Sequence, residues 1–185
     1  MTSSRAHIVP HYLRRFARAE QGVAAIEMAF IFPVMLLLYF GLVDITNLMS
    51  ANRRVTLAAS TLGDLVTQSA ETIKKADLTG MYAAVAPIMD PFPAANVKIE
   101  IFGYKKSGSS AVLSWSNSKN GSCGGAPSTT GLANLMTDGN DLVVSRVCVD
   151  YPPITGMVFG TDDITLQDEV ILRPRQSTAL ACTDC

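Results

Sequence analysis

The chain has 185 residues, of which 48% are hydrophobic and 17% are charged, and its formal net charge is −1 with an isoelectric point near 6.1. This length leaves room for one membrane segment and one modest folded domain. Basic residues outside the N-terminal region form no stripe, so nucleic-acid binding has little support. The mean hydropathy of +0.25 comes largely from one apolar segment.

Residues 1–22 form a polar leader. It contains Arg5, Arg14, Arg15 and Arg18 and both histidines of the chain, His7 and His11. The positive-inside rule therefore predicts a cytoplasmic leader and an exported remainder, because the far flank of the apolar segment begins with Asp44. An ordinary secretory signal is the alternative, but its apolar core would be shorter than the one here.

Residues 23–43 predict a transmembrane helix, since about 20 apolar residues cross the hydrocarbon core. Glu27 is the only charged side chain in this segment. A carboxylate inside a membrane helix costs about 2.5–3.5 kcal/mol at the centre and less near an end, so it usually has a partner or a function. Glu27 could instead be a helix-end acid, favoured by the N-terminal dipole of an uncleaved anchor.

Gly22, four small or apolar residues and then Glu27 at the head of an apolar helix resemble the class III signal of type IV pilins. The run AIEMAFIFPVMLLLYFGLVDI, residues 25–45, resembles the opening of TadE-like minor pilins (pseudopilins) of tight-adherence, or Flp, pili. The resemblance is specific over residues 14–45, weaker to about residue 76 and absent beyond. Met28 departs from the aromatic residue that often follows the glutamate in that family.

The resemblance implies that a prepilin peptidase cuts after Gly22 and frees the α-amino group of Val23. Glycine suits this position because it lets a protease approach the backbone closely. The new ammonium and the Glu27 carboxylate would lie one helical turn apart, and they could pair within one chain or between neighbouring subunits. The implied partners are other pilins, the inner-membrane assembly platform and membrane lipid.

Residues 44–90 predict a helical stalk. Apolar residues recur at alternating spacings of three and four, which favours a helix face laid against a partner surface. The positions, of which Asn52 and Ser69 are two polar interruptions, are Ile45, Leu48, Asn52, Val55, Ala59, Leu62, Val66, Ser69 and Ile73. We expect one helix over about 23–75 whose seam packs on the chain's own domain, with a coiled coil as the alternative. Asp77 is then expected to cap a second helix through about Met89.

Residues 91–185 predict a β-rich domain after the break at Asp90-Pro91-Phe92-Pro93. Alternating or apolar patterns predict strands at 97–101, 111–115, 142–149 and 164–172, the first two forming a hairpin around a turn at 105–110. A Gly-rich loop at 121–131, a helical turn at 132–136 and a short C-terminal tail complete the expectation. The predicted fold class is α+β: a long N-terminal helix packed on a small, mostly antiparallel sheet, as in pilins.

Four cysteines, Cys123, Cys148, Cys182 and Cys185, lie on the predicted exported side, where disulfides are expected. Of the three possible pairings we prefer Cys123 with Cys148 and Cys182 with Cys185. A zinc site made by all four cysteines and a redox-active C-x-x-C at Cys182 are alternatives. Neither histidine lies beyond the leader, which excludes histidine-dependent catalysis or metal binding in the exported part.

These observations predict a non-enzymatic minor pilin without a cofactor, cut after Gly22 and acting in priming or at the tip of a tight-adherence pilus. It would span the bacterial inner membrane once, with its C-terminal domain periplasmic and possible later entry into the pilus. The alternatives are an uncleaved, membrane-anchored scaffold or binding domain of an envelope complex, and an envelope thiol oxidoreductase.

Overall fold

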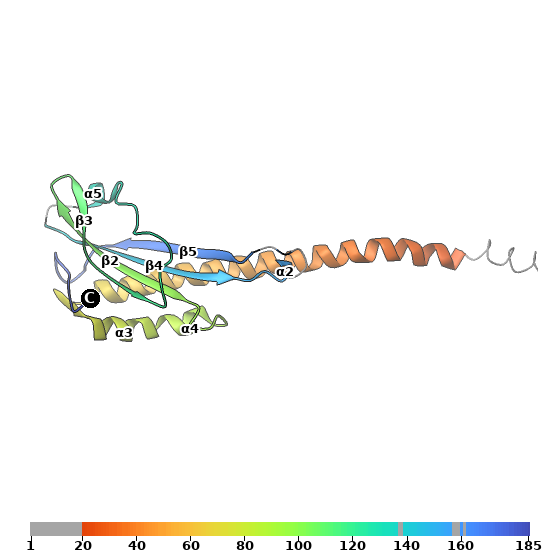
Figure 1. Ribbon diagram of the computed structural model, residues 1–185, viewed down its shortest axis with the longest axis horizontal. Helices are drawn as coiled ribbons and strands as arrows, with labels where there is room; N and C mark the ends of the chain where they lie inside the picture. Colours follow the sequence, from red (N-terminus) through yellow and green to blue (C-terminus); the bar gives the residue numbers. More distant parts are fainter. Residues whose placement is uncertain (1–19, 137–138, 157–159, 161) are drawn as a thin grey trace, which may run out of the picture. The chain divides into compact units, whose positions relative to one another are not determined.

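The computed structural model describes residues 20–136, 139–156, 160 and 162–185. The chain divides into two compact units, the first ending at Asp44 and the second comprising Ile45–Cys185. Helix α2, Glu20–Thr67, contributes to both of them. The α+β class predicted from the sequence is confirmed (Figure 1).

In the first unit, α2 exposes its apolar side chains around its whole circumference. The exposed large residues run from Val23 to Leu42 and include Ile26, Phe30, Leu38 and Tyr39. The helix is long and apolar enough to cross a membrane, the one such helix among the described residues. Pro33 lies within it. A helix that is apolar on every side requires an apolar environment, in accord with the predicted anchor.

The second unit is built on a four-stranded antiparallel sheet with the strand order β3-β2-β4-β5. A separate two-stranded parallel sheet joins β1 to β6. The strands are β1 Thr72–Lys74, β2 Lys98–Ser107, β3 Ser110–Lys119, β4 Leu142–Tyr151, β5 Ile164–Leu172 and β6 Ala181–Thr183. The remaining helices are α3 Lys75–Ala83, α4 Val85–Met89 and α5 Leu132–Leu135.

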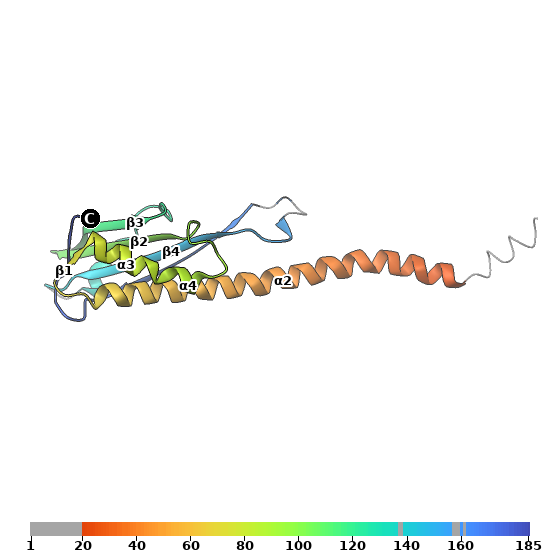
Figure 2. The same ribbon diagram turned by 90° about the horizontal axis from the view of Figure 1, so that it is seen from below.

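One face of the large sheet packs against α2, α3 and α4 (Figure 2). From α2, this core takes Val55, Ala59, Leu62 and Val66, all completely buried. The middle of the predicted seam is therefore confirmed, and its partner is the chain's own domain. Ile45 and Asn52, which the seam also included, are exposed.

The predicted helix over 23–75 is too long, because α2 ends at Thr67. There the backbone N–H of Arg175 donates to the Thr67 carbonyl over 2.9 Å, which satisfies one of the carbonyls that a helix end leaves open. Ile73, predicted on the seam, lies instead in β1 and pairs with Cys182 of β6. The predicted C-terminal tail is thus partly strand β6. The segment from Arg175 to β6 contacts the end of α2 and the residues that follow it.

The predicted helix from Asp77 to Met89 is divided into α3 and α4. Pro87 explains the division, because it has no N–H to donate to the carbonyl of Ala83 and its ring collides with that carbonyl in a continuous helix. Asp77 lies in the first turn of α3 and not at its cap. Its carboxylate accepts a hydrogen bond from the backbone N–H of Lys74 over 3.1 Å.

The strands are longer than predicted, except for β5, whose bounds agree with the prediction. The predicted turn at 105–110 is too long, since Lys105 and Lys106 continue β2 and pair with Val112 and Ala111. Only two residues connect β2 to β3, and Gly108 among them has a φ of 62°, a conformation that glycine adopts without strain.

Gly103 is required by the packing of Trp115. A Cβ built on Gly103 would lie 2.2 Å from Nε1 of the indole, which donates a hydrogen bond to the Leu180 carbonyl over 2.8 Å. The β-bulge at Gly103/Tyr104 lies at the same place. The indole therefore crosses the strand through space that only glycine leaves open.

We predict that Gly103→Ala destabilises the second unit by about 1–3 kcal/mol, because the added methyl group must displace a ring fixed by a hydrogen bond. The measurement is thermal unfolding of the detergent-solubilised chain, followed by near-UV circular dichroism of its one tryptophan. Gly80→Ala is the control, since a Cβ on Gly80 in α3 meets no atom within 4 Å. An unfolding temperature as high for Gly103→Ala as for Gly80→Ala would contradict the prediction.

Candidate processing and assembly site

Gly22 lies near the start of α2 and is exposed. A Cβ added there meets no heavy atom within 4 Å, and its φ lies outside the positive range that favours glycine. Glycine in a helix costs about 0.5–1 kcal/mol relative to alanine. The described contacts of this chain therefore do not require glycine at this position.

Val23 and Glu27 are separated by four residues on α2, so they share one face of the helix. Both are exposed, and their neighbours along the helix are the exposed apolar residues Ile26, Met28 and Phe30. Within the described ranges, no hydrogen bond or ion pair joins the Glu27 carboxylate to another residue. The Glu27 carboxylate is therefore a charged group among apolar side chains. A partner for this carboxylate would come from the leader, from lipid or from another chain.

The cysteines of the second unit form two disulfides, Cys123–Cys148 and Cys182–Cys185, in the pairing that the sequence analysis preferred. Cys148 is completely buried in β4, and its Cα lies 5.8 Å from that of Cys123. The first disulfide thereby fixes the Gly-rich loop over the sheet face opposite α2, beside a small apolar cluster. That cluster consists of Phe102, Tyr104, Ala111, Leu132, Met136, Leu142 and Val144.

A buried ion pair lies beneath this loop. Nη1 of Arg146 is 3.6 Å from Oε2 of Glu100 and donates to the Gly125 carbonyl over 2.7 Å, while Nη2 donates to Oε2 of Glu169 over 2.9 Å. The guanidinium also lies 5.6 Å from the centre of the Phe102 ring.

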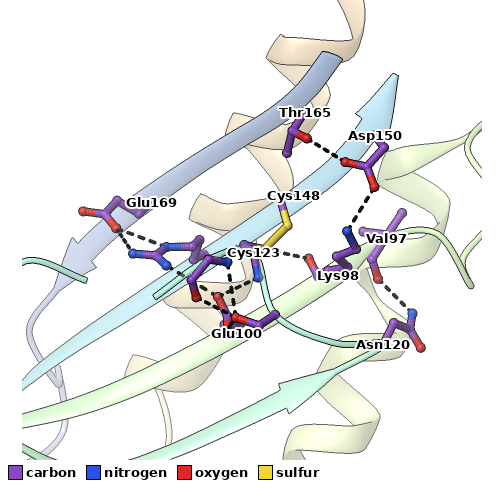
Figure 3. Close-up of a disulfide and its surroundings, with 12 residues drawn as sticks. Val97, Lys98, Glu100, Asn120, Cys123, Cys148, Asp150, Thr165 and Glu169 are labelled. Carbon is purple, nitrogen blue, oxygen red and sulfur yellow. Dashed lines mark hydrogen bonds and ion pairs between the residues drawn. A yellow bond between two sulfur atoms is a disulfide. The ribbon is translucent and has the colours of Figure 1, made fainter. Parts of the chain in front are cut away.

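The Glu100 carboxylate uses both of its oxygens, accepting from the Ser122 hydroxyl over 2.8 Å and from the Cys123 N–H over 3.2 Å (Figure 3). The loop thus adds hydrogen bonds to both members of the buried pair, Glu100 and Arg146.

A second ion pair lies at the surface close to the disulfide. Nζ of Lys98 is 3.0 Å from Oδ2 of Asp150, and Thr165 donates to Oδ1 over 2.8 Å (Figure 3). The hydrogen bond from Lys98, followed by that from Thr165, lowers the pKa of the Asp150 carboxyl below its ordinary value. The carboxylate is therefore charged at neutral pH and serves as a surface contact.

The cysteines of the second unit and its buried Glu100–Arg146 pair are engaged in structural contacts. All four cysteines are in disulfides, which leaves no thiolate for the alternative zinc site. Over the described ranges no group of three or more potential metal ligands comes together. Cys182 lies in strand β6 and not at a helix N-terminus, the place where a reactive C-x-x-C gains its low thiol pKa.

Sequence reasoning missed the Glu100–Arg146 pair. The alternation around Val97-Lys98-Ile99-Glu100-Ile101 predicted a strand with one solvated face, whereas Glu100 is only 5% exposed. The available signal was a charge in the middle of each of two long apolar strands, at Glu100 in β2 and Arg146 in β4. These residues are directly opposite each other in the register.

Residues 22–62 match the family described as TadE-like protein. The matched segment begins at Gly22, contains Glu27 and covers most of α2. The resemblance to TadE-like proteins predicted from the N-terminal residues is thereby confirmed. No curated protein and no solved structure gives a match.

We predict that Arg146→Met destabilises the second unit by about 3–5 kcal/mol, because it leaves the Glu100 carboxylate buried without its cation. The double variant Glu100→Leu with Arg146→Met should lose less than the sum of the two single losses. Denaturant unfolding in detergent measures all three. Lys98→Met, which breaks the exposed pair with Asp150, is the control and should cost about 0–1 kcal/mol; equal losses for Arg146→Met and Lys98→Met would be evidence against the pair's importance.

Proposed function

We propose that this chain is a minor pilin, or pseudopilin, of a tight-adherence pilus, cut after Gly22 by a prepilin peptidase. The observation that supports this most strongly is the TadE-like match that begins at Gly22, a glycine that the described chain itself does not need. A peptidase that binds the backbone closely supplies a reason for the missing side chain.

The proposed role is structural and not enzymatic. The chain lies in the bacterial inner membrane through residues 23–43, with its leader in the cytoplasm and its second unit in the periplasm, as the arginines of the leader favour. Its partners are the peptidase, other pilins and the assembly platform. Because it carries a whole folded unit beyond the helix, priming or a place at the tip suits it better than a place in the shaft.

Glu27 is proposed to bind the ammonium group that cleavage creates on Val23 of a neighbouring subunit. The carboxylate has an exposed, apolar setting in which an unpaired charge is costly. An ion pair between chains compensates both charges at once. It also fixes the axial position of one helix against the next.

We expect coexpression with a prepilin peptidase to yield a chain that begins at Val23, and Gly22→Val to block this cut. Intact mass of the membrane-extracted protein distinguishes the two forms. Gly41→Val is a matched control, since Gly41 lies in the same helix with equally open space around it and should not affect cleavage. A full-length wild-type mass in cells that assemble the pilus would favour the uncleaved anchor instead.

We expect Glu27→Gln to leave cleavage intact but to prevent entry into the pilus or its assembly complex. The amide cannot neutralise the neighbour's ammonium, a loss of several kcal/mol per contact, whereas a dipole interaction alone would be worth about 1 kcal/mol or less. Pilus counts and co-purification with assembly partners are the measurements. Glu27→Asp keeps the charge and should retain more function; unchanged pilus numbers in the Glu27→Gln strain would refute pairing between subunits.

A further inference from the structure

Two adjoining hollows lie in the second unit beside residues 46–57 of α2. One has a volume of about 580 Å³ and lies between α2 and α4, and the other, of about 360 Å³, lies between α2, the loop before β2 and the end of β4. Ser50 and Arg54 line both of them. We call this surface the juxtamembrane rim and define it by Met49, Arg53, Phe92, Tyr151 and Ile154.

The rim begins very close in the chain to the predicted span. Thr46, the first residue of the larger hollow, is three residues beyond Val43, which is a rise of about 4.5 Å on a helix. The headgroup layer on each side of a bilayer is about 5–8 Å thick. Helical side chains lean toward the N-terminus of their own helix, and Met49 and Arg53 both belong to α2.

The side chains of the rim have the chemistry of a membrane interface. Met49 is 56% exposed and Ile154 is 43% exposed, and the rings of Phe92 and Tyr151 lie edge to face at 6.3 Å. Apolar, aromatic and arginine side chains together are typical of the depth at which hydrocarbon meets headgroups. An exposed apolar surface of this kind is stabilised by contact with a bilayer, and the predicted span lies only a few residues away along α2.

The charges of the rim also favour phospholipid. Arg54 donates to the backbone carbonyls of Ile88 and Asp90, which holds α4 and the following loop against α2. Arg53 is exposed, and no hydrogen bond or ion pair connects its guanidinium with any other described residue. Asp90 is the acid beside this arginine pair. Arg53 is therefore the group available for a phosphate.

We propose that the juxtamembrane rim rests on the phospholipid headgroups of the bilayer that α2 crosses, with Met49 and Ile154 toward the glycerol layer and Arg53 on a lipid phosphate. This inference depends on membrane anchoring through residues 23–43 but not on cleavage after Gly22. It describes the subunit before it leaves the membrane for an assembly.

The test uses the full chain, with its disulfides intact, in nanodiscs of phosphatidylcholine with or without phosphatidylglycerol. A fluorescent amino acid replaces Ile154 or, as the control, Leu113, which is equally exposed at 43%. Leu113 pairs with Tyr104, which pairs with Leu142 at the start of β4, whereas Ile154 follows the end of β4. The two labels thus report opposite ends of the sheet, and a quencher attached to the lipid headgroup should quench only the label at 154.

The second variant is Arg53→Gln. One basic residue near an anionic surface is worth about fivefold in binding, so the ratio of docked to undocked units should fall about fivefold in the discs with phosphatidylglycerol. Lys105→Gln removes the same charge from the opposite end of the sheet and should change nothing.

Equal quenching at 154 and 113, or quenching at 154 that Arg53→Gln does not reduce, would overturn the proposal. So would a label at 154 that is shielded from a water-soluble quencher without being reached by the lipid quencher, since another protein chain would then cover the rim. Cleavage after Gly22 is read separately by intact mass, so either proposal can fail alone.

Discussion

The second unit depends on the close approach of α2 to the large sheet. Small residues on the buried side of the helix, among them Ala58, Ala59 and Gly63, allow this approach. A Cβ on Gly63 would lie 2.7 Å from a methyl carbon of Leu172 and 2.8 Å from the hydroxyl of Ser145. That hydroxyl, completely buried, donates to the Ala59 carbonyl over 2.6 Å. Helix and sheet are therefore joined by both packing and a buried hydrogen bond, and the same helix supplies the apolar segment of the first unit.

The opposite face of the sheet is covered in a different way. A loop with little apolar content lies over it, and its contribution is hydrogen bonding to the buried charges of Glu100 and Arg146. Such a loop cannot be held by hydrophobic contact alone, and the Cys123–Cys148 disulfide provides the missing constraint. The arrangement suits an oxidising compartment, where such a bond persists.

Patterns local in sequence were sufficient for much of this fold. The apolar period of α2, the β2–β3 hairpin and the bounds of β5 follow from spacings within a few residues. The end of α2 could not be predicted in this way, since it depends on Arg175 and on the pairing of β1 with β6, more than 100 residues away. The same holds for Glu100, whose burial depends on a Gly-, Ser- and Thr-rich loop that contains no charged residue. At the candidate site, Gly22 and Glu27 were recognisable from type and spacing, because their proposed roles concern partners outside the fold.

The contacts of residues 175–183 bear on the order in which the second unit can form. The end of α2, the indole of Trp115 and strand β1 each take a hydrogen-bonding partner from this stretch, through Arg175, Leu180 and Ala181–Thr183. A chain that emerges N-terminus first presents all of these acceptors and donors before their partners arrive. The growing polypeptide thus lacks these contacts until strand β6 has been made, so the second unit cannot close before residues 181–183 are present.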